Sequence, residues 1–96
     1  MRSLCFLLAA AAFAADHKLD ATPGNIAWGH YFAGTKPVLR VRSGDTVAMR
    51  TVSGSPARLE QAGLAPGRIQ PELRAVSEQV KDRGPGGHLL TGPVYI

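Results

Sequence analysis

The chain has a single cysteine among its 96 residues, Cys5, and this cysteine lies in the apolar stretch at the N-terminus. A disulfide needs two cysteines, and a blue-copper site needs a cysteine thiolate beside two histidines. Beyond the N-terminal stretch the sequence supplies no thiol. It therefore excludes a disulfide framework, a thiolate metal site and a cupredoxin-type electron carrier.

A strong excess of charge is also lacking. Eleven basic and seven acidic residues give a net charge of +4, and aromatic residues make up only 6% of the sequence. A nucleic-acid-binding surface needs a basic stripe or a known module, whereas here the arginines are scattered and no basic run is interleaved with aromatics. We predict that the protein binds no nucleic acid and has an ordinary charged surface.

Long apolar runs are absent except near the N-terminus. Met1–Arg2 is a short basic start, the apolar Leu4–Leu8 and an alanine run follow, and Ala12–Ala14 fits the small-x-small pattern of a cleavage site. We interpret residues 1–14 as a signal peptide that directs export to the periplasm or the extracellular space. Because the stretch is too short to span a bilayer as a helix, no stable membrane anchor is expected after cleavage.

Residues 15–96 allow one small domain. A chain of this size buries only about 60% of the surface that its unfolded state exposes, and no disulfides compensate. The apolar Val94–Ile96 also has the composition of a strand that is only beginning. We therefore expect the truncated N-terminal segment of a longer domain, mainly β with short helices (α+β).

The clearest structural pattern lies over residues 36–52. Pro37–Arg42 and Thr46–Val52 are rich in β-branched residues, apolar and polar side chains alternate along them, and Ser43–Asp45 connects them. Two such runs joined by a short glycine-containing connection predict a β-hairpin with one buried face. Further short strands are expected at His17–Leu19 and Ile26–Trp28.

A short helix is predicted over residues 56–62. Ser55 is a suitable N-cap, and Pro56 suits the first helical position. Gly63 can end the helix in a Schellman motif.

A second helix is predicted over residues 71–81. Its apolar residues fall on one stripe, which should pack on the sheet: Leu73, Val76 and Val80. Arg74 and Glu78 have the i, i+4 spacing of a helical ion pair.

The glycine-rich loop 84–93 holds the strongest candidate for chemistry. His88 follows Gly86 and Gly87, and glycines leave space beside an imidazole that can bind a metal or carry a proton. The alternative is a loop histidine that is hydrogen-bonded to backbone. Spacing alone leaves both interpretations open.

For the other polar and aromatic features we favour structural interpretations. Asp45 is expected to bond the backbone of its own turn, and the aromatic cluster Trp28–Phe32 to pack in the core rather than line a pocket. Lys81–Arg83 is expected to be a solvated helix end. His17 and His30 have no partner at ligand spacing.

The sequence contains no nucleophile elbow, phosphate-binding loop or dinucleotide fingerprint. Its three histidines are well separated, and no acidic residues form a paired cluster. A complete catalytic site cannot be assembled from these residues by motif.

Several blocks nevertheless occur in an order that resembles the start of the acetamidase/formamidase family. The resemblance covers nearly all of the chain after residue 14, and its longest and most specific block runs from Lys81 to Val94. The other blocks are His17–Pro23, Trp28–Gly29, Pro37–Leu39 and Ser43–Val47.

This resemblance implies a β-sandwich-like amidohydrolase that acts on carbon–nitrogen bonds other than peptide bonds. Its substrates would be small linear amides such as formamide and acetamide, split into a carboxylate and ammonia. It implies a divalent metal, with zinc as the first choice. We expect the full-length protein to form a homo-oligomer.

The resemblance also assigns roles within the glycine-rich loop. It implies that His88 is a catalytic residue, as metal ligand or proton-transfer group, with Thr91 and Gly92 shaping the site beside Gly86 and Gly87. Family members often have a histidine where this chain has Ala27. The remaining catalytic residues are expected beyond Ile96, so the 96-residue chain is expected to be inactive by itself.

The alternative function is a non-catalytic, exported β-sandwich module that binds a ligand. The Val-x-Ser-Gly-Asp-Thr-Val phrase is shared by many such domains. This function would not require His88.

Overall fold

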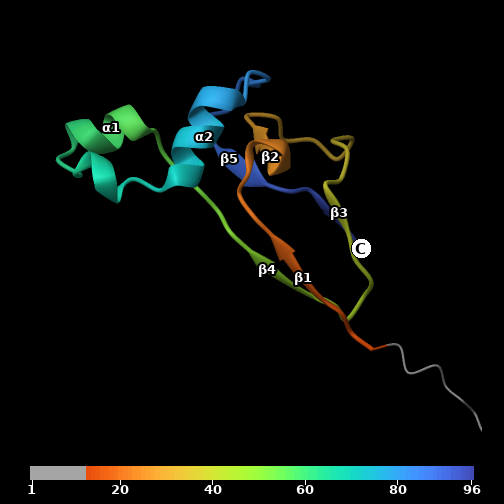
Figure 1. Ribbon diagram of the computed structural model, residues 1–96. Helices are drawn as coiled ribbons and strands as arrows, with labels where there is room; N and C mark the ends of the chain where they lie inside the picture. The colour runs from red at the N-terminus through yellow and green to blue at the C-terminus, as the bar shows by residue number, and fades with distance from the viewer. Residues whose placement is uncertain (1–12) are drawn as a thin grey trace, which may run out of the picture.

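The computed structural model describes residues 13–96 (Figure 1). Most of the predicted signal peptide, residues 1–12, lies outside the described residues. The rest is a small mixed chain of short helices and small sheets, which agrees with the predicted α+β class. The elements are β1 (Asp16–Leu19), η1 (Pro23–Asn25), β2 (Ile26–Trp28), β3 (Leu39–Arg40), β4 (Thr46–Met49), α1 (Pro56–Gln61), η2 (Pro66–Arg68), α2 (Pro71–Gln79), β5 (Leu89–Thr91) and β6 (Val94–Tyr95).

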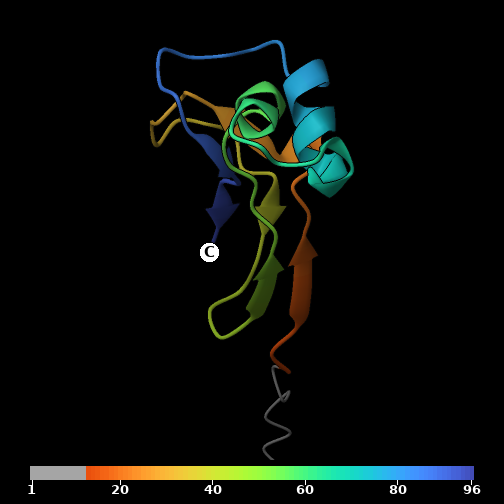
Figure 2. The ribbon, with the colours of Figure 1, turned by 90° about the vertical axis from the view of Figure 1, so that its left-hand side faces the viewer.

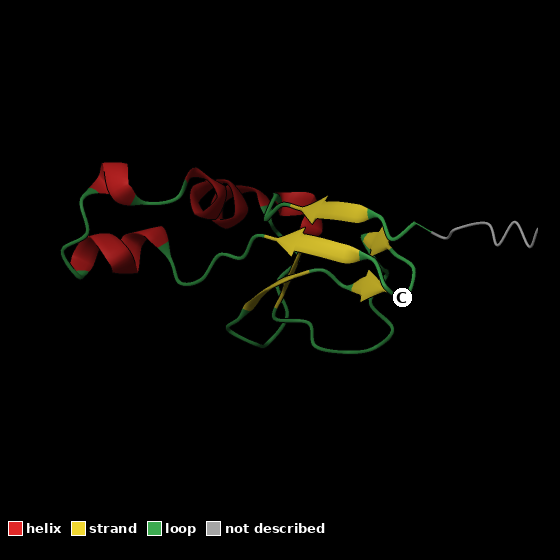
Figure 3. Ribbon diagram, turned by 90° about the horizontal axis from the view of Figure 1, so that it is seen from below, coloured by secondary structure: helices red, strands yellow, loops and turns green. Residues whose placement is uncertain are grey.

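Within residues 13–96 the strands form three two-stranded sheets, each joining segments that are distant in the sequence. Strands β1 and β4 are parallel, β2 and β5 antiparallel, and β3 and β6 parallel. The helices lie toward one end of the molecule and the strands toward the other (Figure 3). No helix of the described part is long and apolar enough to cross a membrane.

The prediction of a hairpin over residues 36–52 is wrong. Strand β3 pairs with β6 and strand β4 with β1, so the two runs do not pair with each other. The turn between them is held by Asp45, whose side chain accepts hydrogen bonds from the backbone of both Arg42 and Ala15. Alternation of apolar and polar residues determines which face of a strand is buried, but not which strand lies beside it.

The core lies between α2 and the segments that lead to β2 and out of β4. Its buried residues are Ala21, Val52, Ile69, Leu73, Val76 and Val80, and Ile26, Trp28, Leu59 and Leu89 pack against them. The predicted stripe of α2 is confirmed, since Leu73 is 1% exposed and Val76 is fully buried. Full burial of such a side chain stabilises the fold by about 1.5–3 kcal/mol. This packing anchors α2 beside β2 and β5 (Figure 1).

The signals for the start and end of α1 are confirmed. The Ser55 hydroxyl accepts a hydrogen bond from the Arg58 N–H at 3.3 Å, and Pro56 occupies the first turn. Gly63 has a φ of 102°. The Leu64 N–H donates to the Leu59 carbonyl at 3.0 Å, which is the Schellman pattern.

Helix α2 ends at Gln79 rather than at Lys81, because Val80 has an extended backbone. The predicted pair of Arg74 with Glu78 is replaced by a bond to another helix. Arg74 donates to the Glu60 carboxylate of α1 at 2.8 Å and to the Pro66 carbonyl at 2.9 Å. The arginine therefore joins α2 to α1 and η2 instead of stabilising its own helix.

Candidate functional site

The glycine-rich loop docks on the turn that follows β2. The Gly84 N–H donates to the Trp28 carbonyl at 2.7 Å, and the Gly86 N–H to the Gly29 carbonyl at 3.2 Å. In return, the Gly29 N–H donates to the His88 carbonyl at 3.1 Å. Figure 2 shows the segment between α2 and β5 arching across to this turn. Two motif blocks that are distant in the sequence thus form one backbone unit.

Glycine is required at both sides of this contact. Gly29 has a φ of +75°, and a β-carbon there would lie 2.5 Å from the Gly86 carbonyl oxygen. A β-carbon at Gly84 would collide with the Gly29 carbonyl and lie 2.8 Å from Nδ1 of His30. At Gly86 the space for a side chain is occupied by the Tyr31 ring, whereas at Gly87 it is open. The close approach of the two segments explains why glycine is needed at positions 29, 84 and 86.

His88 lies at the exposed end of this unit. Its backbone N–H donates to the Tyr31 hydroxyl at 2.7 Å, and its ring is tilted against the Tyr31 ring with the centroids 6.4 Å apart. The imidazole is therefore accessible to solvent beside an aromatic side chain. Its predicted role in catalysis or metal binding stays a prediction.

Thr91 and Gly92 make contacts that position the loop. The Thr91 hydroxyl donates to the Arg50 carbonyl at 2.8 Å. Gly92 is buried, with a φ of 129°, and its N–H donates to the Asn25 carbonyl at 2.9 Å. These bonds join the β5 segment to the end of β4 and to η1. Thr91 and Gly92 therefore hold the C-terminal end of the loop in place.

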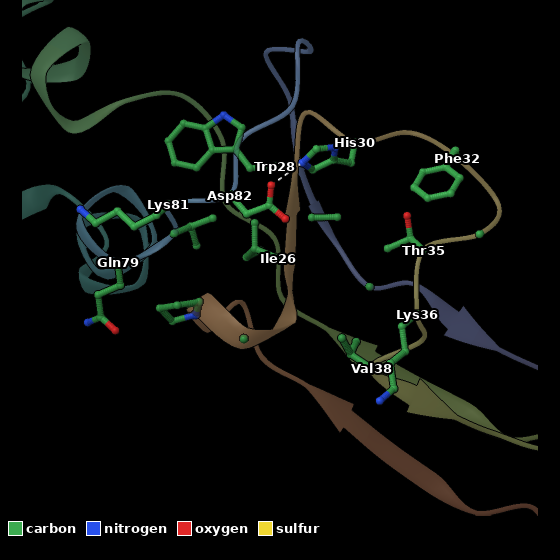
Figure 4. A pocket seen from close by; sticks show the side chains of 16 residues that line it. Ile26, Trp28, His30, Phe32, Thr35, Lys36, Val38, Gln79, Lys81 and Asp82 are labelled. Atoms are coloured by element: carbon green, nitrogen blue, oxygen red, sulfur yellow. Dashed lines mark hydrogen bonds and ion pairs between the residues drawn. The ribbon is translucent and has the colours of Figure 1, made fainter.

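The structure brings together two residues that the sequence did not connect. Nε2 of His30 lies 2.8 Å from a carboxylate oxygen of Asp82, across a separation of 52 residues (Figure 4). Asp82 precedes Arg83 in the segment that was expected to be only a solvated helix end. The sequence signal was indirect: His30 directly follows the Trp28–Gly29 block, and Asp82 lies within the Lys81–Val94 block that docks on it.

A pocket of about 750 Å³ opens beside this pair. Its apolar lining includes Ile26, Trp28, Phe32 and Val38. In Figure 4, Trp28 and Asp82 lie on one side of β2, and Phe32 and Thr35 on the other. The Thr35 hydroxyl is buried and has no hydrogen-bond partner among the described residues, so it is free to bond a ligand. A second cavity, of about 500 Å³, shares His30, Phe32 and Thr35.

Trp28 has both of the roles that were weighed for it. It packs against the core cluster, and it also lines the larger pocket. The Arg83 guanidinium lies 3.9 Å from the centre of its ring and donates to the Ser77 carbonyl at 2.7 Å and the Val80 carbonyl at 3.1 Å. Arg83 therefore fixes the indole against the end of α2.

Asp45 has the structural role predicted for it. Its carboxylate accepts hydrogen bonds from the backbone N–H groups of Ala15 and Arg42 and pairs with Nε2 of His17, each at 2.9 Å. The two backbone hydrogen bonds, followed by that of His17, lower the pKa of Asp45 from 3.8 to about 2. His17 thus has a partner, but in a turn rather than in a pocket.

A structural or catalytic metal ion needs several ligands that converge on one point. Among residues 13–96, no three histidine, cysteine or acidic side chains converge on one point. His88 is the candidate ligand, and it belongs to no such group of three among the described residues. These residues alone therefore do not fit a metal ion.

The chain matches no family model, no curated protein and no solved structure. The resemblance to the acetamidase/formamidase family therefore stays a prediction that rests on the order of the motif blocks.

Proposed function

We propose that this chain is the N-terminal part of an exported hydrolase of the acetamidase/formamidase type, which splits small linear amides into a carboxylate and ammonia. The observation that supports the proposal is the docking of the Lys81–Val94 block on the Trp28–Gly29 block. These are two of the blocks that carry the resemblance. Residues of both blocks line the larger pocket, namely Trp28, Lys81, Asp82 and Gly92.

The chemistry of amide hydrolysis suits groups of this kind. An amide resists water because its carbonyl is stabilised by resonance and its nitrogen is a poor leaving group. Hydrolysis therefore needs proton transfer to the nitrogen and stabilisation of charge on the carbonyl oxygen. An exposed imidazole at His88 can bind or relay a proton, and the apolar lining of the pocket suits a short acyl group.

A divalent metal would supply Lewis-acid polarisation of the carbonyl in such an enzyme, with zinc the first choice. His88 is the residue of this chain that we assign to it. Further ligands would have to come from outside residues 13–96.

The proposal is tested on the protein expressed from the complete reading frame that contains these residues. Ammonia release from formamide and acetamide is measured for the wild type and for His88→Ala. We expect His88→Ala to lower turnover by about 100-fold or more, since that is the usual contribution of an acid–base group. His17→Ala, outside the loop, is the matched control, and circular dichroism verifies folding. Turnover of His88→Ala near that of the wild type would overturn the role of His88.

A ligand-binding module is the second candidate function. The buried, unpaired Thr35 hydroxyl in an open pocket supports it, because such a group suits a bound polar ligand without any need for His88. Calorimetric binding of acetamide with no release of ammonia would favour this function over hydrolysis.

A further inference from the structure

Beyond His88, the geometry points to His30 as a proton-transfer residue that lines the pocket, with Asp82 as the residue that positions it. This inference rests on the proposed hydrolase function. It starts from the placement of His30, whose side chain is 35% exposed and lines both cavities. No other histidine of the described chain lines either cavity.

The pairing with Asp82 determines which nitrogen can react. Nε2 is 2.8 Å from the carboxylate, which favours a proton on that nitrogen and leaves Nδ1 as the basic one. Nδ1 faces Gly84, where a β-carbon would come within 2.8 Å of it. Glycine at position 84 therefore leaves the room that the His30 ring needs at this nitrogen.

In the proposed step, Nδ1 of His30 takes a proton from a water molecule as the water oxygen bonds to the amide carbon. The carbonyl oxygen accepts the electron pair and becomes an oxyanion. When the carbonyl re-forms, the carbon–nitrogen bond breaks, and the proton held by His30 passes to the leaving nitrogen. The products are a carboxylic acid and ammonia, and His30 is again neutral.

The test compares ammonia release by the full-length wild type with that of His30→Ala, Asp82→Asn and the control His17→Ala. We expect His30→Ala to lower kcat by about 100-fold with little change in KM. Because the Asp82 carboxylate is 92% exposed, Asp82→Asn should lower kcat by only about tenfold or less. Added imidazole should restore part of the activity of His30→Ala but not that of Asp82→Asn.

The outcomes distinguish the role of His30 from the proposed hydrolase function. If the wild type hydrolyses amides and His30→Ala keeps its kcat, the role of His30 is wrong while the hydrolase function stands. If the wild type releases no ammonia from any small amide, both proposals fail.

A second inference comes from the other end of the chain. We infer that cleavage after Ala14 places the new α-ammonium group of Ala15 on the carboxylate of Asp45. The Ala15 N–H already donates to Asp45 at 2.9 Å, and the Asp45 side chain is only 5% exposed.

Cleavage would change the charge of this donor without moving it. Ala15 is held from its other side, since its carbonyl accepts a hydrogen bond from the Thr46 N–H at 3.0 Å. Hydrolysis of the Ala14–Ala15 bond turns the amide nitrogen into an ammonium group, so a hydrogen bond from a neutral donor to the carboxylate becomes one between opposite charges. The other charged side chains nearby are His17 on Asp45, and Asp16, which contacts Thr46. Removal of the leader would therefore strengthen the pairing of β1 with β4.

The test is a labelling experiment on the exported, full-length protein. An ammonium group bound to a carboxylate reacts slowly with an acylating reagent, so the Ala15 amine should be labelled several-fold more slowly in the wild type than in Asp45→Asn. His17→Gln is the control, because it keeps the Asp45 charge. Equal labelling rates in the wild type and Asp45→Asn would overturn the inference, as would an N-terminus other than Ala15 by mass spectrometry.

Discussion

Two histidine–aspartate pairs among residues 13–96 have nearly equal distances and opposite settings. His17 lies 2.9 Å from Asp45, and His30 lies 2.8 Å from Asp82. The side chain of Asp45 is 5% exposed and that of Asp82 is 92% exposed. The first pair lies at the turn between two strands, and the second beside a pocket.

The backbone around each carboxylate explains the difference. Asp45 receives two backbone N–H groups in addition to His17, and these fix a turn and the start of β1. Asp82 receives only the imidazole among the contacts of the described residues, so it orients a ring that lines the pocket. A histidine–aspartate distance alone therefore does not identify a catalytic pair. What distinguishes the two pairs is the number of other hydrogen-bond donors to the carboxylate.

The largest effect is expected from a substitution at Gly84, because the His30 ring of the second pair packs against this residue. In Gly84→Ala the new methyl would collide with the Gly29 carbonyl and press on the His30 ring. We expect a loss of about 1–3 kcal/mol in the free energy of unfolding, the usual cost of overpacking, together with loss of amide hydrolysis. Urea denaturation measures the first effect and ammonia release the second.

Gly87→Ala is the matched control, because a β-carbon there meets nothing within 4 Å. It should change stability by less than about 0.5 kcal/mol. Equal effects of the two alanines would mean that the close contact at Gly84 does not hold the loop in solution.

The next effect concerns the first pair and depends on pH. The pKa of Asp45 is lowered in the folded state to about 2 from an ordinary value of 3.8, so the folded chain favours the charged form. Its contribution to stability is therefore complete above the ordinary pKa and is lost as the pH falls through the folded value. Asp45→Asn should destabilise the protein at pH 7 and remove this part of the acid dependence between about pH 4 and pH 2.

Urea midpoints measured from pH 7 to pH 2 check this prediction. The wild-type curve should fall toward that of Asp45→Asn as the acid range is reached. Curves that stay parallel over the whole range would contradict a structural role for the Asp45 charge.

The comparison of the pairs also shows what the sequence could and could not predict. The helix caps and the stripe of Leu73 and Val76 were predicted correctly, because a helix is determined by residues within one or two turns of each other. The role of Asp45 was predicted for the same reason, since its turn partner Arg42 is close by in the sequence.

Apart from the end of α2, which is Gln79 instead of Lys81, the errors concern long-range partners. The hairpin prediction was wrong because strand pairing depends on contacts across the whole fold. Strand β4 pairs with β1, and β3 pairs with β6. Arg74 was assigned to Glu78 on its own helix, whereas the structure joins it to Glu60. His30 and Asp82 went unconnected because only the docking of the glycine-rich loop brings them together.

The smallest effect on stability is expected at the second pair itself. Asp82→Asn removes a charge that is 92% exposed, and an exposed ion pair contributes little because water and salt screen it. The free energy of unfolding should change by less than about 0.5 kcal/mol, whereas Asp45→Asn should be clearly destabilising under the same conditions. Urea denaturation at pH 7 in low and high salt measures both variants side by side. A large loss of stability in Asp82→Asn would make this pair a structural one like His17 and Asp45, and the distinction on which the role of His30 depends would then be lost.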